Sequence, residues 1–166
     1  MPNLFAAAIL ITIIFLVITI ADVVTNKLII KGTKIKTVIA CLLIMASALG
    51  ECVGVYTNGA PVSLVFLHKT AKLVELSLAP SIGVAVAIVC GDVKKPRLVI
   101  GLVAAQALFE CVALRFGWVF SVDAQNIYHR EMLFPVYVTA FVLSVACGSL
   151  QSSATEKHIR SALTVF

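Results

Sequence analysis

Five long apolar segments, separated by short polar segments, dominate the chain. They cover residues 4–24, 36–56, 61–91, 98–114 and 132–150. An α-helix rises about 1.5 Å per residue, so roughly 20 residues cross a hydrocarbon core about 30 Å thick. The pattern therefore predicts an all-α fold: a polytopic membrane helix bundle with five transmembrane helices, forming a single domain over residues 1–166.

The third apolar segment is longer than an untilted crossing requires. It opens at Pro61, which suits a first helical turn because the missing N–H would be unpaired there in any case. Pro80 lies inside the segment, where a proline removes one backbone hydrogen bond and clashes with the preceding turn. We therefore expect a long third helix that is kinked or broken at Pro80.

The composition excludes an ordinary water-soluble domain. Apolar residues make up 61% of the 166 positions and charged residues only 13%, whereas soluble domains are about half apolar and about a quarter charged. The net charge of +5 does not indicate nucleic-acid binding, because the basic residues lie in short segments between apolar ones instead of on one solvated face. The expected partner is the lipid bilayer, and no nucleic acid is expected.

The placement of Lys and Arg predicts the orientation, since cytoplasmic flanks carry the excess of these residues. With the N-terminus outside, the inner segments hold nine of them: Lys27, Lys31, Lys34, Lys36, Lys94, Lys95, Arg97, Lys157 and Arg160. The outer segments hold two, Arg115 and Arg130. We therefore expect the N-terminus outside, the C-terminus in the cytoplasm, and a multi-pass protein of the cell inner (plasma) membrane.

Polar residues within the apolar segments gather at one depth. Glu51 lies 15 residues after Lys36, which is about 22 Å along a helix, and Glu110 lies 15 residues after Lys95. An ionisable residue inside a membrane span costs at least about 2.5 kcal/mol on insertion scales, so such residues point to function. We predict an outward-facing polar pocket that binds an unknown small ligand, with these candidate residues: Glu51, His68, Lys69, Lys72, Glu75, Gln106, Glu110, His129 and Arg130.

The same residues also allow a purely structural interpretation. Lys72 and Glu75 are three positions apart, and Gln106 and Glu110 are four apart, so each pair can meet on one helix. Pairs that fix the helix register, or side chains that extend toward lipid headgroups, need no ligand. In a further possible arrangement, Glu51 and Glu110 share a proton or a basic partner. The sequence does not distinguish between a ligand pocket, structural pairs and this shared site.

The second and fourth segments share a short pattern. Residues 48–53 (ALGECV) align with residues 107–112 (ALFECV) at an offset of 59, and the same offset pairs Lys36 with Lys95. Two helices that run in the same direction with matching residues favour a parallel repeat of two helix hairpins. Chance similarity between apolar helices is the alternative, and it explains the shared Glu-Cys pair least well.

The sequence contains no motif typical of catalysis, metal binding or cofactor binding. The P-loop, dinucleotide-binding and nucleophile-elbow patterns are absent. The three histidines are far apart, and the five cysteines show no C-x-x-C spacing and read as small buried hydrophobic residues. We expect no enzymatic activity, no metal and no cofactor.

Two stretches carry a resemblance to a known group. Residues 76–82 (LSLAPSI) resemble the "F-S-L-T-P-L-I" segment of membrane sensor regions that precede bacterial diguanylate cyclase (GGDEF) domains and some sensor histidine kinases. Residues 128–134 (YHREMLF) are similar to the "Y-H-R-G-P-L-F" segment that enters the fifth helix of that group, with Glu131 in place of the usual glycine.

The resemblance implies seven helices followed by a cytoplasmic output domain, of which this chain would hold the first five helices as a truncated or isolated input module. The expected function is then a membrane-embedded signal-input (sensor) module. The alternatives are a small-solute permease component or substrate-binding membrane subunit of an importer, and a purely structural assembly subunit. A homodimer formed through the membrane helices is compatible with each.

Overall fold

The computed structural model describes residues 2–90, 96–143 and 146. The described chain is mostly helical, as the sequence predicts. Its elements in order are α1 (Pro2–Thr25), α2 (Lys31–Thr57), a 3-10 turn η1 (Val62–Leu64), α3 (Val65–Cys90), α4 (Pro96–Phe116), strands β1 (Phe120–Val122) and β2 (Tyr128–Arg130), and a helix over Phe134–Leu143.

Three described helical segments are long and apolar enough to cross a membrane: Leu4–Thr25, Lys31–Thr57 and Val62–Val89. They coincide with the first three predicted spans, and they indicate a membrane protein. The second helix begins at Lys31 instead of residue 36. The lysines of that first turn are compatible with a membrane-boundary helix because their aliphatic stems cover apolar surface while the charged heads reach water.

The predicted fourth and fifth spans are described only in part. Helix α4 covers the predicted range 98–114, and the helix Phe134–Leu143 covers the first part of the range 132–150. Neither belongs to the helices that meet the length and composition of a membrane span within residues 2–90, 96–143 and 146. Lys94, Lys95 and the residues after 146 lie outside the described part of the chain, so five crossings remain a prediction.

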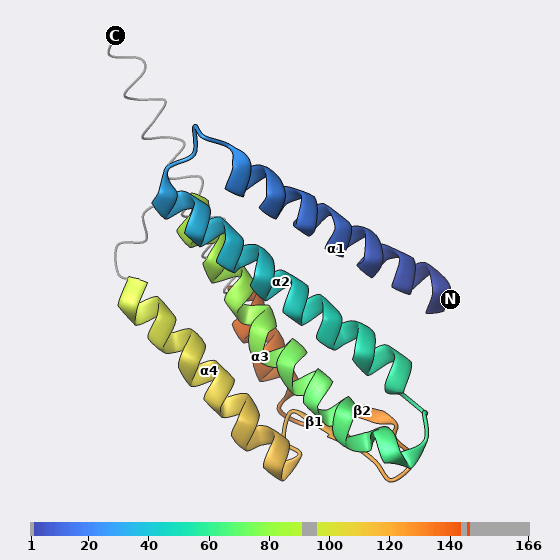
Figure 1. Ribbon diagram of the computed structural model, residues 1–166. Helices are drawn as coiled ribbons and strands as arrows, with labels where there is room; N and C mark the ends of the chain where they lie inside the picture. The colour runs from blue at the N-terminus through green and yellow to red at the C-terminus, as the bar shows by residue number, and fades with distance from the viewer. Residues whose placement is uncertain (1, 91–95, 144–145, 147–166) are drawn as a thin grey trace.

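Helix α3 lies between α2 and α4, while α1 packs on the far side of α2 (Figure 1). Helices α2 and α4 run in the same direction, as the parallel repeat requires. The most extensive contact joins α2 and α3. Gly50 allows the two helices to lie this close, because a Cβ atom at its position would lie only 2.9 Å from the backbone oxygen of Ala71. Small residues of this kind let membrane helices approach closely.

Pro80 does not break α3. The residue is buried, and helical structure is continuous from Val65 to Cys90. The expectation of a break at this position is therefore wrong, whereas a kink stays a prediction. A proline is tolerated inside a packed helix when neighbouring helices support the turn from which one hydrogen bond is missing.

A short β-hairpin occupies the segment that follows α4, between the fourth and fifth predicted helices. Strands β1 and β2 are antiparallel, with Phe120 opposite Arg130 and Val122 opposite Tyr128. The all-α expectation is thus incomplete at this end of the bundle. The hairpin forms because Val119 and Phe120 are fully buried in a cluster with Leu76, Ala113 and Tyr137.

Candidate functional site

A pocket of about 480 Å³ opens at the end of the bundle where α2 ends, α3 begins and the hairpin packs. Figure 1 shows these elements meeting at the lower right. The volume is within the range of about 300–1,000 Å³ that is typical of small-molecule sites. Its lining residues are Glu51, Gly54, Val55, Asn58, His68, Lys72, Glu75, Leu76, Tyr128, Arg130, Phe134, Tyr137 and Phe141.

His68 has the most constrained side chain of the pocket. It is fully buried, and its Nδ1 lies 2.9 Å from Oδ1 of Asn126. The amide nitrogen of Asn126 donates to the backbone oxygens of Thr57 at 2.7 Å and Ala60 at 3.1 Å, so the amide oxygen faces the ring. No hydrogen-bond partner is recorded for the Nε2 atom of His68 among the described residues.

The two cationic side chains of the pocket are engaged with neighbours. Lys72 Nζ donates to Glu75 Oε2 at 2.7 Å and lies 5.1 Å from the centre of the Tyr128 ring. The Arg130 guanidinium lies 4.8 Å from the centre of the Phe134 ring. The predicted pairing of Lys72 with Glu75 is therefore confirmed, and it neutralises one positive and one negative charge inside the pocket.

Glu51 also lines the pocket, from the last turns of α2. Its side chain is half-buried, and no hydrogen bond or ion pair is recorded for its carboxylate within residues 2–90, 96–143 and 146. Its charge acts on Glu75 across the pocket. Glu51 is thus a carboxylate at the wall of the cavity that remains available to a ligand.

Tyr128 closes the pocket from strand β2. Burial raises the pKa of its hydroxyl, and the nearby Glu75 carboxylate acts in the same direction, while Arg130 opposes both. The ring stacks on Phe120 at a centroid distance of 5.9 Å and lies 6.5 Å from the His68 ring. The hairpin therefore contributes an uncharged, hydrogen-bonding aromatic wall.

The structure brings together five of the predicted site residues, namely Glu51, His68, Lys72, Glu75 and Arg130. The other candidates, which do not line the pocket, are Lys69, Gln106, Glu110 and His129. A ligand-binding role for any of these residues stays a prediction.

Glu110 lies in α4 and does not line the polar pocket, although its charge acts on Tyr128 and Tyr137, which do. It is fully buried and accepts a hydrogen bond from Gln106 Nε2 at 2.8 Å, which confirms the predicted pairing of these two residues. Within the part of the chain that the structure describes, its Oε2 atom has no recorded hydrogen-bond partner. No hydrogen bond to Glu51 is recorded for it in the described part of the chain, so the shared proton between the two carboxylates is not supported.

His129 points to the exposed side of the hairpin. Its Nε2 lies 2.9 Å from Oδ2 of Asp123. This contact, together with the backbone N–H groups of Ile127 and Gln125, holds the pKa of the Asp123 carboxyl below its usual range. The pair fixes the hairpin turn and takes no part in the pocket.

Asn126 orients a side chain of the pocket, and the sequence pattern does not predict this role. It positions His68 although the two residues are 58 positions apart. Asn tolerates a positive φ in turns, and Asn126 has a φ of 63°. The residue type therefore predicts a turn at this position, but it does not predict that the amide contacts His68.

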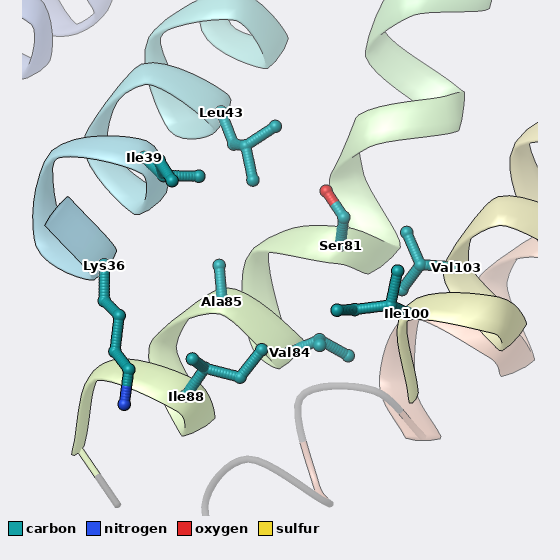
Figure 2. Close-up of a pocket in the computed structure, with 9 residues that line it drawn as sticks. All are labelled: Lys36, Ile39, Leu43, Ser81, Val84, Ala85, Ile88, Ile100 and Val103. Carbon is teal, nitrogen blue, oxygen red and sulfur yellow. The ribbon is translucent and has the colours of Figure 1, made fainter. Parts of the chain in front are cut away.

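A second pocket, of about 300 Å³, lies between α2, α3 and α4 near the opposite end of the bundle (Figure 2). Its wall is almost entirely aliphatic, and the hydroxyl of Ser81 donates to the backbone oxygen of Leu78. Among the described residues that line it, Lys36 is the charged one. The mostly aliphatic wall favours an apolar occupant, with the Lys36 ammonium at one edge.

No group of three or more His, Cys, Asp or Glu side chains within residues 2–90, 96–143 and 146 is arranged to hold a metal ion. Cys41, Cys52 and Cys111 are free.

Comparison of the chain with protein-family models, with curated proteins and with solved structures found no match.

Proposed function

We propose that the chain is a membrane-embedded signal-input module whose polar pocket binds a small ligand on the outer side of the cell inner membrane. The observation that carries this proposal is the pocket itself: His68, Lys72 and Glu75 converge on a cavity at one end of a bundle of apolar helices. Ionisable residues are costly in a membrane and mark functional sites by default.

The proposal includes five membrane crossings with the N-terminus outside. Helix α4 supplies the fourth crossing, and the helix that begins at Phe134 supplies the start of the fifth. In this orientation the polar pocket faces outward, and the lysine-rich turn between α1 and α2 faces the cytoplasm. The apolar pocket of Figure 2 then lies toward the cytoplasmic half.

A signal requires two packing states with different affinity for the ligand. The polar pocket is suited to this requirement, because its lining comes from α2, α3, strand β2 and the helix Phe134–Leu143. A ligand that contacts all four elements favours the arrangement in which they are closest. The change in packing would reach a cytoplasmic diguanylate cyclase or histidine kinase, the output that the sequence resemblance implies.

The test is Glu51→Gln, introduced into the chain in cells that produce it from its own gene. We expect a changed level of cyclic di-GMP or of phosphorylated histidine kinase, at an unchanged amount of the protein in the membrane. Asp22→Asn is the matched control, since Asp22 is an exposed carboxylate of α1 outside the pocket. Identical signalling in the Glu51 variant and the wild type would contradict the sensor role.

The second candidate function is a permease component or substrate-binding subunit of an importer, which the same cavity supports because capture of a solute also needs a polar site. Uptake of labelled solutes by vesicles that contain the chain separates the two functions. An importer subunit loses uptake in the Glu51→Gln variant without a change in cyclic di-GMP or kinase phosphorylation, whereas a sensor shows the reverse.

A further inference from the structure

Two hydrogen-bond acceptors that line the polar pocket have no recorded partner within the described residues, namely the Nε2 atom of His68 and the carboxylate of Glu51. Lys72 and Arg130 already have partners, in Glu75 and in the ring of Phe134. A ligand that satisfies Nε2 of His68 and the carboxylate of Glu51 must therefore donate hydrogen bonds.

The hydrogen bonds of Asn126 define the acceptor on His68. Its amide nitrogen is used by the carbonyls of Thr57 and Ala60, so its oxygen faces Nδ1 of His68. A carbonyl oxygen accepts, and Nδ1 must therefore carry the hydrogen. In the neutral ring this leaves Nε2 with a lone pair. Because the side chain is fully buried, an unmatched Nε2 is costly, and a ligand donor removes that cost.

The remaining wall of the pocket is aromatic. Tyr128, Phe134, Tyr137 and Phe141 line the cavity beside the acceptors. Aromatic faces attract cations, most strongly where water is excluded. Together with the Glu51 carboxylate, they favour a positively charged donor over a neutral one.

We propose that the polar pocket binds a small organic amine in its ammonium form, whose N–H groups are accepted by Nε2 of His68 and by the carboxylate of Glu51. The inference rests on the proposed function only in taking this pocket as the ligand site. It names the chemical class of the ligand: a primary or secondary amine with a short apolar or aromatic body.

The test measures binding of matched probes to the full chain in lipid nanodiscs by calorimetry. Phenethylamine is compared with phenethyl alcohol and hydrocinnamate, and butylamine with butanol and butyrate. We expect each amine to bind at least about tenfold more tightly than its alcohol and its carboxylate, because a hydrogen bond to a charged group is stronger than a neutral one. Equal binding within each set, or no binding of either amine, overturns the proposal.

Two further measurements assign the binding to the named residues. Glu51→Gln should weaken amine binding about tenfold or more, whereas the control Asp22→Asn should not change it. In wild-type chain carrying isotope-labelled histidine, the Nε2 resonance of His68 should shift on amine binding, a readout that does not depend on the folding of any variant. An unchanged Nε2 resonance at saturating amine overturns the proposed contact.

The outcomes separate this inference from the proposed function. Selective amine binding without any effect of amines on cyclic di-GMP or kinase phosphorylation would keep the ligand class and remove the sensor role. A signalling response to carboxylates alone would keep the sensor role and remove the ligand class.

Discussion

Asn126 connects three parts of the chain through one side chain. Its amide holds the turn after α2 through the oxygens of Thr57 and Ala60, and it orients His68 at the start of α3. The residue itself belongs to the hairpin turn, where its backbone N–H donates to Asp123. A buried side chain with this many hydrogen bonds is expensive to replace, because each lost partner leaves an unsatisfied group. The geometry of the pocket thus depends on a residue that does not line it.

A prediction at the residue scale concerns the pH dependence of the hairpin turn. The pKa of Asp123 is lowered in the folded turn by His129, and further by the N–H groups of Ile127 and Gln125. A lowered folded pKa means that the ionised carboxylate stabilises the turn above its ordinary pKa of about 3.9, and that this stabilisation is lost as the pH falls through the folded value. We expect the amide resonance of Ile127 to move as the pH falls below about 4, where the Asp123 carboxylate is protonated.

The variant Asp123→Asn is the control for this titration. It keeps an oxygen that accepts from Ile127 and Gln125 but removes the ionisable group, so the shift of the Ile127 resonance below about pH 4 should disappear. A shift that persists in the variant would show that another group titrates there.

Helices α2 and α3 form the pair on which the pocket is built. The approach of the two helices depends on small residues of α2 that face α3, with Ser47, Gly50 and Gly54 all buried. A Cβ atom at Gly54 would lie 2.6 Å from Cε of Lys72, which is a flexible side chain, whereas one at Gly50 would meet backbone atoms. The two glycines therefore have different roles: Gly50 sets the distance between the helices, and Gly54 leaves room for Lys72 in the pocket.

At the element scale we predict that Gly50→Ala destabilises the bundle by about 1–3 kcal/mol, since the added methyl group overpacks a contact with the backbone of α3. Unfolding of the purified chain by heat or denaturing detergent measures the loss. Gly32→Ala is the control, because a Cβ atom there meets nothing within 4 Å, and it should change stability by less than about 1 kcal/mol. Equal stability of the two variants would contradict close α2–α3 packing.

The whole molecule has its lysine-rich turn at one end and its polar pocket at the other. The turn between α1 and α2 carries Lys27, and Lys34 Nζ donates to the backbone oxygen of Val24 across it. The pocket lies where α2 ends and α3 begins. In the orientation that we propose, the lysine-rich turn faces the cytoplasm and the polar pocket faces outward.

At the scale of the whole molecule we predict that two single cysteines are labelled from opposite sides of the membrane. Each is introduced into a variant of the chain from which the native cysteines have been removed. Ser63→Cys, in the exposed turn before α3, should react with a membrane-impermeant thiol reagent applied from outside. Leu28→Cys, with the side chain 93% exposed in the turn between α1 and α2, should react only after the membrane is opened. The reverse pattern would place the polar pocket on the cytoplasmic side.

The contacts that could be predicted from the sequence are local. Lys72 with Glu75 and Gln106 with Glu110 follow from the spacing on one helix, and both pairs are present. The hairpin was not predicted, because its two strands have only three residues each and depend on burial of Phe120 against α3 and α4. Short strands carry too little periodicity to be distinguished from a loop.

The sequence by itself determined the membrane class, the first three long helices and the concentration of polar residues near one depth, because hydropathy and helix rise depend only on the order of residues along the chain. Only the tertiary structure decided which of those polar residues share a cavity: it placed Glu51 and His68 in the pocket, put Glu110 and His129 outside it, and brought Asn126 to His68. The reason is that depth along a helix follows from counting residues, whereas a shared cavity depends on how each helix is rotated about its axis and on which distant segment packs against it.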